Sequence, residues 1–314
     1  MEQYNINNYI FDKPLTSDNS GFAKWGLGKR GGSTFFVKEF LSPTYPLDSS
    51  IYTEEQRQDR IRLCDEFVQE KVKLYSAIRM ASDGNLTVVE QFFRSGAKFY
   101  ISTKAIQQPS LSLEDIARRP FHDRLRLCCS VAHSMMWLHA QEIVHADVKH
   151  DNILVVMNNG VPQAKIIDFD CSFFESCAPK LGEELNGDLV YLSPEGFLHI
   201  AGIESNIGCK MDIFALGILF HQYFTGRLPG IDTNEYQYVY EAVLDDQLPD
   251  LHLIENETCR NIVAAMLSKT PETRPGLQEV FQVLNNILLG VLGRIPGTEE
   301  PYVNSQLFYS PDSL

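Results

Sequence analysis

Two apolar runs enclose a block of ionisable and amide side chains in the segment 143–155, whose sequence is IVHADVKHDNILV. Short apolar runs of this kind are typical of buried strands, and they hold the polar residues between them on a rigid scaffold. The segment therefore predicts a catalytic loop, in which Asp147, Lys149 and Asn152 are the candidate functional side chains.

Four further motifs lie downstream of this segment. They are IIDFD at 166–170, YLSPE at 191–195, DIFALG at 212–217 and TPETRP at 270–275. Each motif carries little information alone, but their joint occurrence in one order and at plausible spacing is a specific signal.

Taken together with the segment 143–155, these motifs resemble the signature set of the protein kinase family. The segment and the first motif are similar to the catalytic loop H-R-D-x-K-x-x-N and the metal-binding D-F-G. The next two resemble A-P-E and the start of the family's buried central helix. Arg274 matches the arginine that pairs with the A-P-E glutamate, here Glu195. The resemblance covers about residues 10–290 and implies an α+β, bilobal, protein-kinase-like fold.

The periodic patterns indicate a strand-rich half followed by a larger helical half. In the first half we expect strands at 22–27, 33–40, 87–93 and 98–106 and a long helix at 54–80. Gly31 and Gly32 predict a tight turn between the first two strands. In the second half we expect helices at 124–139, 212–224, 259–268 and 277–292, the second of them buried on nearly every side.

The chain therefore divides into a small β-rich N-lobe with one major helix at 1–105, a larger, mainly helical C-lobe at 106–296, and an irregular tail at 297–314. With 27 Lys and Arg against 41 Asp and Glu, the formal net charge is −14, which argues against a nucleic-acid partner. No apolar run is long enough to span a bilayer and the first ten residues are polar, so we expect neither a secretory signal nor a membrane partner. The seven cysteines are irregularly spaced without a C-x-x-C pair, which favours reduced thiols and a cytoplasmic location.

The family resemblance implies a nucleotide site for ATP in the N-lobe. Lys38 closes an apolar strand similar to V-A-I-K and is implied to hold the nucleotide phosphates, while Glu70 on the long helix is implied to fix that lysine. The remaining implied contacts are a loop glycine, two roof residues, two hinge residues and a floor contact: Gly21, Ala23, Phe36, Thr103, Ala105 and Leu154.

The resemblance also implies the parts that carry the chemistry. Asp168 and Asn152 are implied to bind Mg²⁺, Asp147 to orient the attacking hydroxyl, and Lys149 to neutralise charge on the transferring phosphoryl group. A lysine two residues after the catalytic-loop aspartate, here Lys149 after Asp147, is similar to the pattern of the serine/threonine branch of the family. A protein substrate is favoured, because the family uses the A-P-E region to seat a peptide.

Four departures from the family pattern bear on activity. Only Gly21 remains of the glycine-rich loop, and Ala146 replaces the arginine of H-R-D, which predicts an activation loop that needs no phosphate. Asp170 replaces the glycine of D-F-G, where we favour a hydrogen bond within the turn over a further metal ligand. Phe36 replaces the alanine that roofs the adenine, and the small Ala23 nearby compensates in volume if the adenine still fits.

Other interpretations stay open at this point. Taken singly, Lys38 is typical of a solvated strand end, Glu70 of a helix surface charge paired with Lys73, and Asp147 and Asp168 of turn or cap residues. As a whole, the chain is interpreted as an active, divergent serine/threonine kinase using ATP and Mg²⁺. The alternatives are a pseudokinase that acts as a binding or scaffold module with an occluded adenine pocket, and a kinase-fold enzyme that acts on a small molecule or transfers a different phosphate-containing group.

Overall fold

The computed structural model describes residues 4–18, 23–47 and 51–293. The chain forms two compact units. The sheet unit consists of Met1–Met80 and Thr87–Gln107, and the helical unit of Ala81–Leu86 and Gln108–Leu314. The predicted tail at 297–314 and the site residue Gly21 lie outside the described residues.

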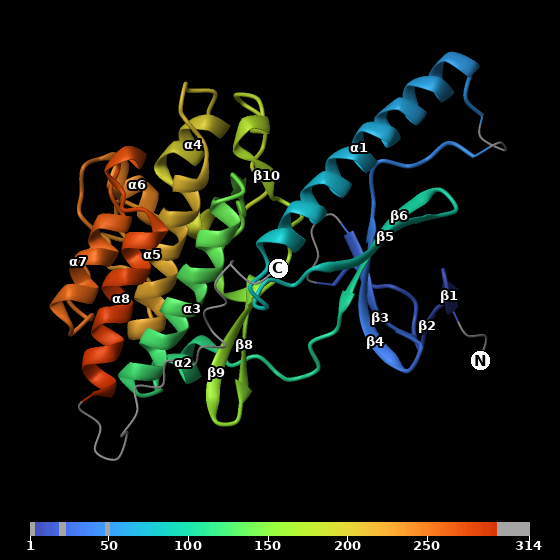
Figure 1. Cartoon of the computed structure of the whole chain (residues 1–314). Helices are drawn as coiled ribbons and strands as arrows, with labels where there is room; N and C mark the ends of the chain where they lie inside the picture. The colour runs from blue at the N-terminus through green and yellow to red at the C-terminus, as the bar shows by residue number, and fades with distance from the viewer. Residues whose placement is uncertain (1–3, 19–22, 48–50, 294–314) are drawn as a thin grey trace. The chain divides into compact units, whose positions relative to one another are not determined.

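The sheet unit is an antiparallel sheet with the strand order β1-β2-β3-β4-β6-β5 and one long helix (Figure 1). Its elements are β1 (Tyr4–Ile6), β2 (Tyr9–Phe11), β3 (Ala23–Arg30), β4 (Ser33–Phe40), α1 (Glu54–Ala81), β5 (Val89–Ser95) and β6 (Lys98–Lys104). The long helix and the four predicted strands are confirmed. So is the tight turn, in which Gly31 and Gly32 have φ values of 55° and 80°, the left-handed backbone that a two-residue hairpin turn requires.

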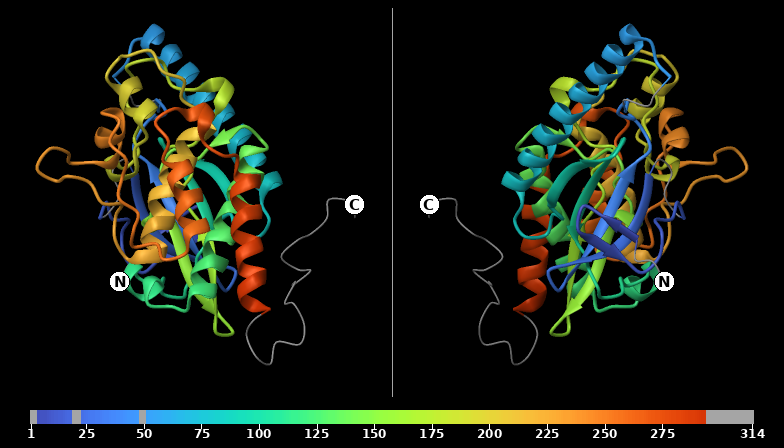
Figure 2. Two further views of the ribbon diagram at one scale, coloured as in Figure 1. Left: turned by 90° about the vertical axis from the view of Figure 1, so that its left-hand side faces the viewer. Right: turned by 90° about the vertical axis from the view of Figure 1, so that its right-hand side faces the viewer.

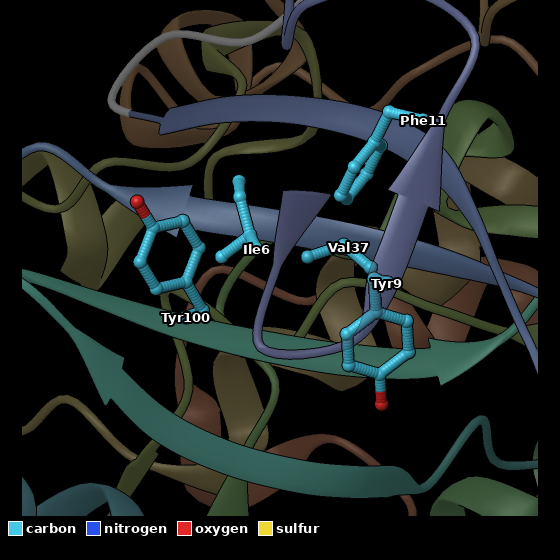
Figure 3. Close-up of a cluster of buried hydrophobic side chains, with 5 residues drawn as sticks. All are labelled: Ile6, Tyr9, Phe11, Val37 and Tyr100. Atoms are coloured by element: carbon cyan, nitrogen blue, oxygen red, sulfur yellow. The ribbon is translucent and has the colours of Figure 1, made fainter. Parts of the chain in front are cut away.

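The hairpin of β1 and β2 is an element that the sequence analysis missed. Asn7 and Asn8 form its turn with φ values of 47° and 68°, which asparagine tolerates better than most residues. Its apolar side chains join β4 and β6 in one buried cluster, drawn in Figure 3: Ile6, Tyr9, Phe11, Val37 and Tyr100. At Gly28 a Cβ atom would lie 2.9 Å from the Phe11 ring, so a glycine in β3 is what admits that ring.

A second set of aromatic rings joins α1 to the sheet. Phe67 of α1 meets Phe40 of β4 with ring centroids 5.2 Å apart and Phe99 of β6 at 5.5 Å. Phe92 of β5 completes the group, at 6.0 Å from Phe67. Aromatic pairs at these separations add to the free energy of area burial. The long helix is therefore fixed to β4, β5 and β6 by packing.

The helical unit contains the following helices and short strands: α2 (Leu113–Ala117), α3 (Phe121–His139), β7 (Ile143–Val144), β8 (Ile153–Asn158), β9 (Val161–Ile166), β10 (Phe173–Phe174), α4 (Pro194–Ile200), α5 (Cys209–Thr225), α6 (Val239–Leu244), α7 (Glu257–Met266) and α8 (Leu277–Leu292). The four predicted helices correspond to α3, α5, α7 and α8. Helix α5 is buried from Met211 to Phe224, as its apolar surface predicts. Figure 2 shows α8 lying alongside α3 in this unit. Among the described residues, no helix combines the length and apolar character needed to cross a bilayer.

An ion pair predicted from the sequence sits in the interior of the helical unit. Arg274 donates from Nη1 and Nη2 to the two carboxylate oxygens of Glu195, at 2.6 and 2.8 Å. Its other N–H groups donate to the backbone carbonyls of Ser268, Lys210 and Lys269. Every N–H of the guanidinium is therefore used, which is the condition under which a buried charge is tolerated.

Candidate functional site

The catalytic loop predicted at 143–155 connects β7 to β8, and Asp212 of α5 fixes its first turn. The backbone N–H groups of His145 and Ala146 donate to Asp212 Oδ2 and Oδ1, at 2.8 and 2.9 Å. His139 Nε2 lies 2.9 Å from Asp212 Oδ2 as well. Asp212 is buried, so these bonds form away from competing water. The loop is thus attached to the core helix through its backbone.

Asp147 is the most highly connected side chain of this loop. Asn152 Nδ2 donates to Asp147 Oδ2 at 2.7 Å and to the Asp147 backbone oxygen at 2.8 Å. Lys149 Nζ lies 3.1 Å from Oδ2, and the backbone N–H of Asp188 donates to Oδ1 at 3.1 Å. The structure thus brings the three candidate residues of the loop together, with the Asp147 carboxylate held in one orientation.

The charge of Lys149 is stabilised by the carboxylates around it. Burial by itself lowers the pKa of Lys149. The hydrogen bond to Asp147 and the charges of Asp147 and Asp188 outweigh burial and raise the pKa above its ordinary value. Lys149 Nζ is 4.0 Å from Asp188 Oδ2. Lys149 is therefore a permanent cation beside Asp147 at neutral pH.

Two residues of the site have left-handed backbone without being glycine. Ala146 has a φ of 64° and Asp168 a φ of 61°. Such a conformation costs about 1–2 kcal/mol for an ordinary residue, so the surrounding bonds must impose it. Gly187 lies against the first of these turns, because a Cβ atom there would approach the Ala146 carbonyl oxygen to 2.5 Å. Glycine at 187 thereby lets the neighbouring Asp188 reach Asp147.

The D-F-D sequence lies next to this loop. Phe169 is buried, and its ring centroid is 5.1 Å from that of His145, as expected for two core residues. The backbone N–H of Ile167 donates to the Asn152 carbonyl at 2.9 Å. Asp168 is exposed, and the backbone N–H of Asp170 lies 3.4 Å from Asp168 Oδ1, a long contact across the turn. Leu154, predicted as a floor contact, is half-buried in β8.

The donor set of Asn152 and Asp168 fits a magnesium ion. The amide nitrogen of Asn152 is committed to Asp147, which leaves its amide oxygen as the available ligand atom. Together with the Asp168 carboxylate this offers hard oxygen ligands, which Mg²⁺ prefers. Among the described residues no group of three or more His, Cys, Asp or Glu side chains could hold a metal. Phosphate and water oxygens would have to complete the coordination, as is usual for Mg²⁺ with nucleotides.

In the sheet unit, Lys38 is a buried residue of β4 rather than a solvated strand end, with 7% of its surface exposed. Its cross-strand partners are Trp25 of β3 and Ile101 of β6. Phe36, two residues earlier on the same face of β4, pairs with Leu27 and Thr103. Cross-strand partners share a face of a sheet, so these side chains emerge on the side of Lys38.

The other predicted nucleotide contacts in this unit lie at strand ends. Ala23 begins β3 and is buried. Thr103 lies in β6, and Ala105 follows that strand, where its backbone N–H donates to the Thr34 carbonyl at 3.1 Å. Both are half-buried.

Glu70 does not have the environment that its predicted role requires. Its side chain is exposed on α1, and no hydrogen bond or ion pair of Glu70 occurs within the described part of the chain, with Lys38 or with Lys73. The next residue, Lys71, faces the sheet, with Nζ 5.9 Å from the Phe40 ring centroid. Helical phase does not account for this exposure, because position 70 is three residues after Phe67 and four before the buried Leu74 and therefore lies on their side of α1.

The segment that follows D-F-D contains two serines in different environments. Ser172 is buried, and its Oγ donates to the His145 carbonyl at 3.0 Å. Ser176 is exposed. The first is a structural hydroxyl that ties this segment to the catalytic loop, and only the second is open to solvent.

Three residues that support the site, Asp212, Gly187 and Trp25, were not predicted from the sequence. Asp212 had been assigned only to a buried helix, although an acid inside an otherwise apolar helix is a signal of a buried polar role. Gly187 gave no signal of its own. Trp25 stacks on Phe36, with ring centroids 5.3 Å apart and an interplanar angle of 21°. Alternation along β3 places Trp25 on the face of Ala23, and that signal was available from the sequence.

The class of protein follows from the fold, from the residues around Asp147 in the helical unit and from the residues around Lys38 in the sheet unit. The sequence profile described as the protein kinase domain matches residues 54–284, most of the chain, so the chain belongs to the protein kinase domain family. It is 22% identical over 249 residues to serine/threonine/tyrosine-protein kinase HT1 of Arabidopsis thaliana, covering 79% of this chain and 59% of that protein. It is 22% identical over 281 residues to calcium-dependent protein kinase 27 of the same plant, covering 87% of this chain and 53% of that protein. It is 28% identical over 211 residues to serine/threonine-protein kinase kin-29 of Caenorhabditis elegans, covering 67% of this chain and 23% of that protein. The chain thus spans between 23% and 59% of the lengths of these relatives.

Proposed function

We propose that this chain transfers the γ-phosphoryl group of ATP to a serine or threonine hydroxyl of a protein substrate. The observation that carries the proposal is the environment of Asp147, whose carboxylate is held by Asn152, Lys149 and the Asp188 backbone. A carboxylate fixed in this way is suited to accept a hydrogen bond from one hydroxyl in one direction.

The proposed reaction is an in-line displacement. The substrate hydroxyl oxygen forms a bond to the γ-phosphorus, the bond from that phosphorus to the bridging oxygen breaks, and ADP leaves. Asp147 orients the hydroxyl and receives its proton. Lys149, held as a cation beside Asp147, opposes the negative charge on the transferring group. In the sheet unit, Lys38 supplies a cation for the nucleotide phosphates.

Mg²⁺ would neutralise the nucleotide phosphates when bound, and Asn152 and Asp168 are the residues proposed to hold it. Glu70 is no longer proposed as the partner of Lys38, because its side chain is exposed without an ion pair among the described residues. Gly21 remains a proposal from the sequence alone. ATP, Mg²⁺, serine/threonine specificity and a cytoplasmic protein substrate are carried over from the family resemblance and cysteine usage.

The test is phosphate transfer to a mixed serine/threonine peptide library with radiolabelled ATP and Mg²⁺. Asp147→Asn should lower the turnover rate at least about 100-fold, the size of a lost general base. The same variant should bind Mg²⁺-ATP with a Kd within about threefold of wild type, because the amide keeps most of the loop's hydrogen bonds. Asp246→Asn, at an exposed acid paired with Lys269, is the matched control and should change neither quantity. Wild-type turnover in Asp147→Asn would remove this residue from the proposed role.

The pseudokinase alternative is decided at Phe36. Its ring stacks on Trp25 within the sheet, which supports a ring that forms part of a roof instead of filling the adenine volume. Phe36→Ala should then weaken ATP binding or at best leave it unchanged, since truncation removes contacts with the base. Calorimetry with ATP and Mg²⁺ measures this. No binding by wild type, followed by clear binding in the variant, would establish the occluded pocket instead.

A further inference from the structure

Trp25 connects three parts of one face of the sheet unit. Its backbone N–H donates to the Thr16 carbonyl at 2.8 Å, and its carbonyl accepts from the Thr16 N–H at 2.9 Å. Its indole N–H reaches further along the same segment and donates to the Asp18 carbonyl at 2.8 Å. Its ring stacks on Phe36, and Lys38 is its cross-strand partner.

Residues 16–18 are the described part of the segment that stands where the family has its glycine-rich loop. Within this segment the backbone N–H of Asp18 donates to Thr16 Oγ1 at 3.1 Å. A glycine-rich loop approaches the phosphates through its backbone N–H groups, so the placement of this segment's backbone would set which donors it offers to a phosphate. The hydrogen bond from the Trp25 indole N–H to the Asp18 carbonyl connects residue 18 to the sheet.

We propose that Trp25 is a positioning residue for the nucleotide, which holds the segment 16–18 against the sheet face that carries Phe36 and Lys38. The proposal rests on the proposed function and deepens it. The Trp25 side chain makes two separate contributions to nucleotide binding. The indole ring supports Phe36 and through it the base, while the indole N–H supports the segment that faces the phosphates.

These two contributions can be measured separately with two ligands. Adenosine carries the base and ribose without phosphates, whereas Mg²⁺-ATP carries both. Trp25→Phe keeps an aromatic ring beside Phe36 and removes the N–H together with the five-membered part of the indole. It should weaken the binding of Mg²⁺-ATP about fivefold, the size of one neutral hydrogen bond, and leave the Kd of adenosine unchanged. Trp25→Leu also removes the aromatic stack and should weaken both ligands.

The control is Trp137→Phe, at the only other tryptophan of the chain. Trp137 lies on α3, and its indole nitrogen donates to His133. This variant should bind both ligands as wild type does. Calorimetry provides the Kd values, and thermal unfolding of each variant verifies that it is folded.

The outcomes distinguish this proposal from the function on which it rests. Wild-type binding of both ligands with no change in Trp25→Phe, or with equal weakening of both ligands, overturns the positioning role and leaves the proposed function standing. Wild-type protein that binds neither ligand overturns both. The selective loss of Mg²⁺-ATP supports both.

The fluorescence of Trp25 tests independently whether the nucleotide binds near this side chain. In a Trp137→Phe background the tryptophan emission comes from Trp25 alone. Addition of Mg²⁺-ATP should change that emission saturably, with the midpoint that calorimetry gives. Calorimetric binding without any change in emission would place the nucleotide away from Trp25 and overturn the proposal.

Discussion

The catalytic loop of the helical unit and the Lys38 face of the sheet unit are held by different kinds of interaction. The loop is fixed by short polar contacts, with Asp212 on its backbone and Asn152, Lys149 and Asp188 on Asp147. The sheet face is fixed by packing, with Trp25 on Phe36 and a layer of phenylalanines under α1. Polar networks are sensitive to residue identity, whereas packing tolerates exchange at conserved volume. We therefore expect substitutions among the polar residues of the loop to be tolerated less well than volume-conserving exchanges on the sheet face.

The largest expected effect tests how strongly the helical unit depends on its polar contacts. Arg274→Ala leaves the buried Glu195 carboxylate and several backbone carbonyls without their donors. We expect a loss of about 3–5 kcal/mol in the free energy of unfolding, measured by urea denaturation. Lys269→Ala, which breaks an exposed pair of similar length with Asp246, is the control and should cost less than about 1 kcal/mol. Equal losses in the two variants would show that burial does not decide the strength of these pairs here.

A smaller effect is expected at the two serines after D-F-D. Ser172→Ala removes the buried bond to the His145 carbonyl and should lower the free energy of unfolding by about 1 kcal/mol. Ser176→Ala is the exposed counterpart and should leave stability unchanged within about 0.5 kcal/mol.

The same pair of variants tests regulation. With Ala146 in place of the H-R-D arginine, a phosphate on this segment has no partner at that position. The double variant should keep most of its phosphotransfer rate, assayed at a temperature where it is folded. A large loss that phosphatase treatment of wild type reproduces would contradict this.

The smallest expected effect is in the sheet unit. Glu70→Gln should change the KM for ATP by less than about twofold, because the side chain is exposed and makes no ion pair among the described residues. Lys38→Met, at a buried cation of the same unit, is the comparison and should abolish measurable turnover. A tenfold or larger rise in KM for Glu70→Gln would show that α1 turns to bring Glu70 to Lys38 during catalysis.

The sequence by itself determined the class of fold, the order of most elements and the position of the segment that carries the candidate catalytic residues. Hydrophobic periodicity located α1, α5 and α8, because burial of one face or of all faces leaves a pattern in the sequence. The ion pair of Glu195 and Arg274 followed from the family resemblance of the two motifs that contain them. The hairpin of β1 and β2 was missed because each strand has three residues, too few for alternation to be recognised.

Only the tertiary structure decided which side chains meet. The exposure of Glu70 could not be derived from its spacing to Phe67 and Leu74, which places it on their side of α1. The buried state of Ser172 depends on where its segment passes the His145 carbonyl. The link from Trp25 to Asp18 and Phe36 joins residues on a strand, a loop and a neighbouring strand. Sequence spacing specifies neighbours along one element, but contacts between elements follow from packing, and for this reason motifs could name the candidate residues but not the partners that each of them contacts.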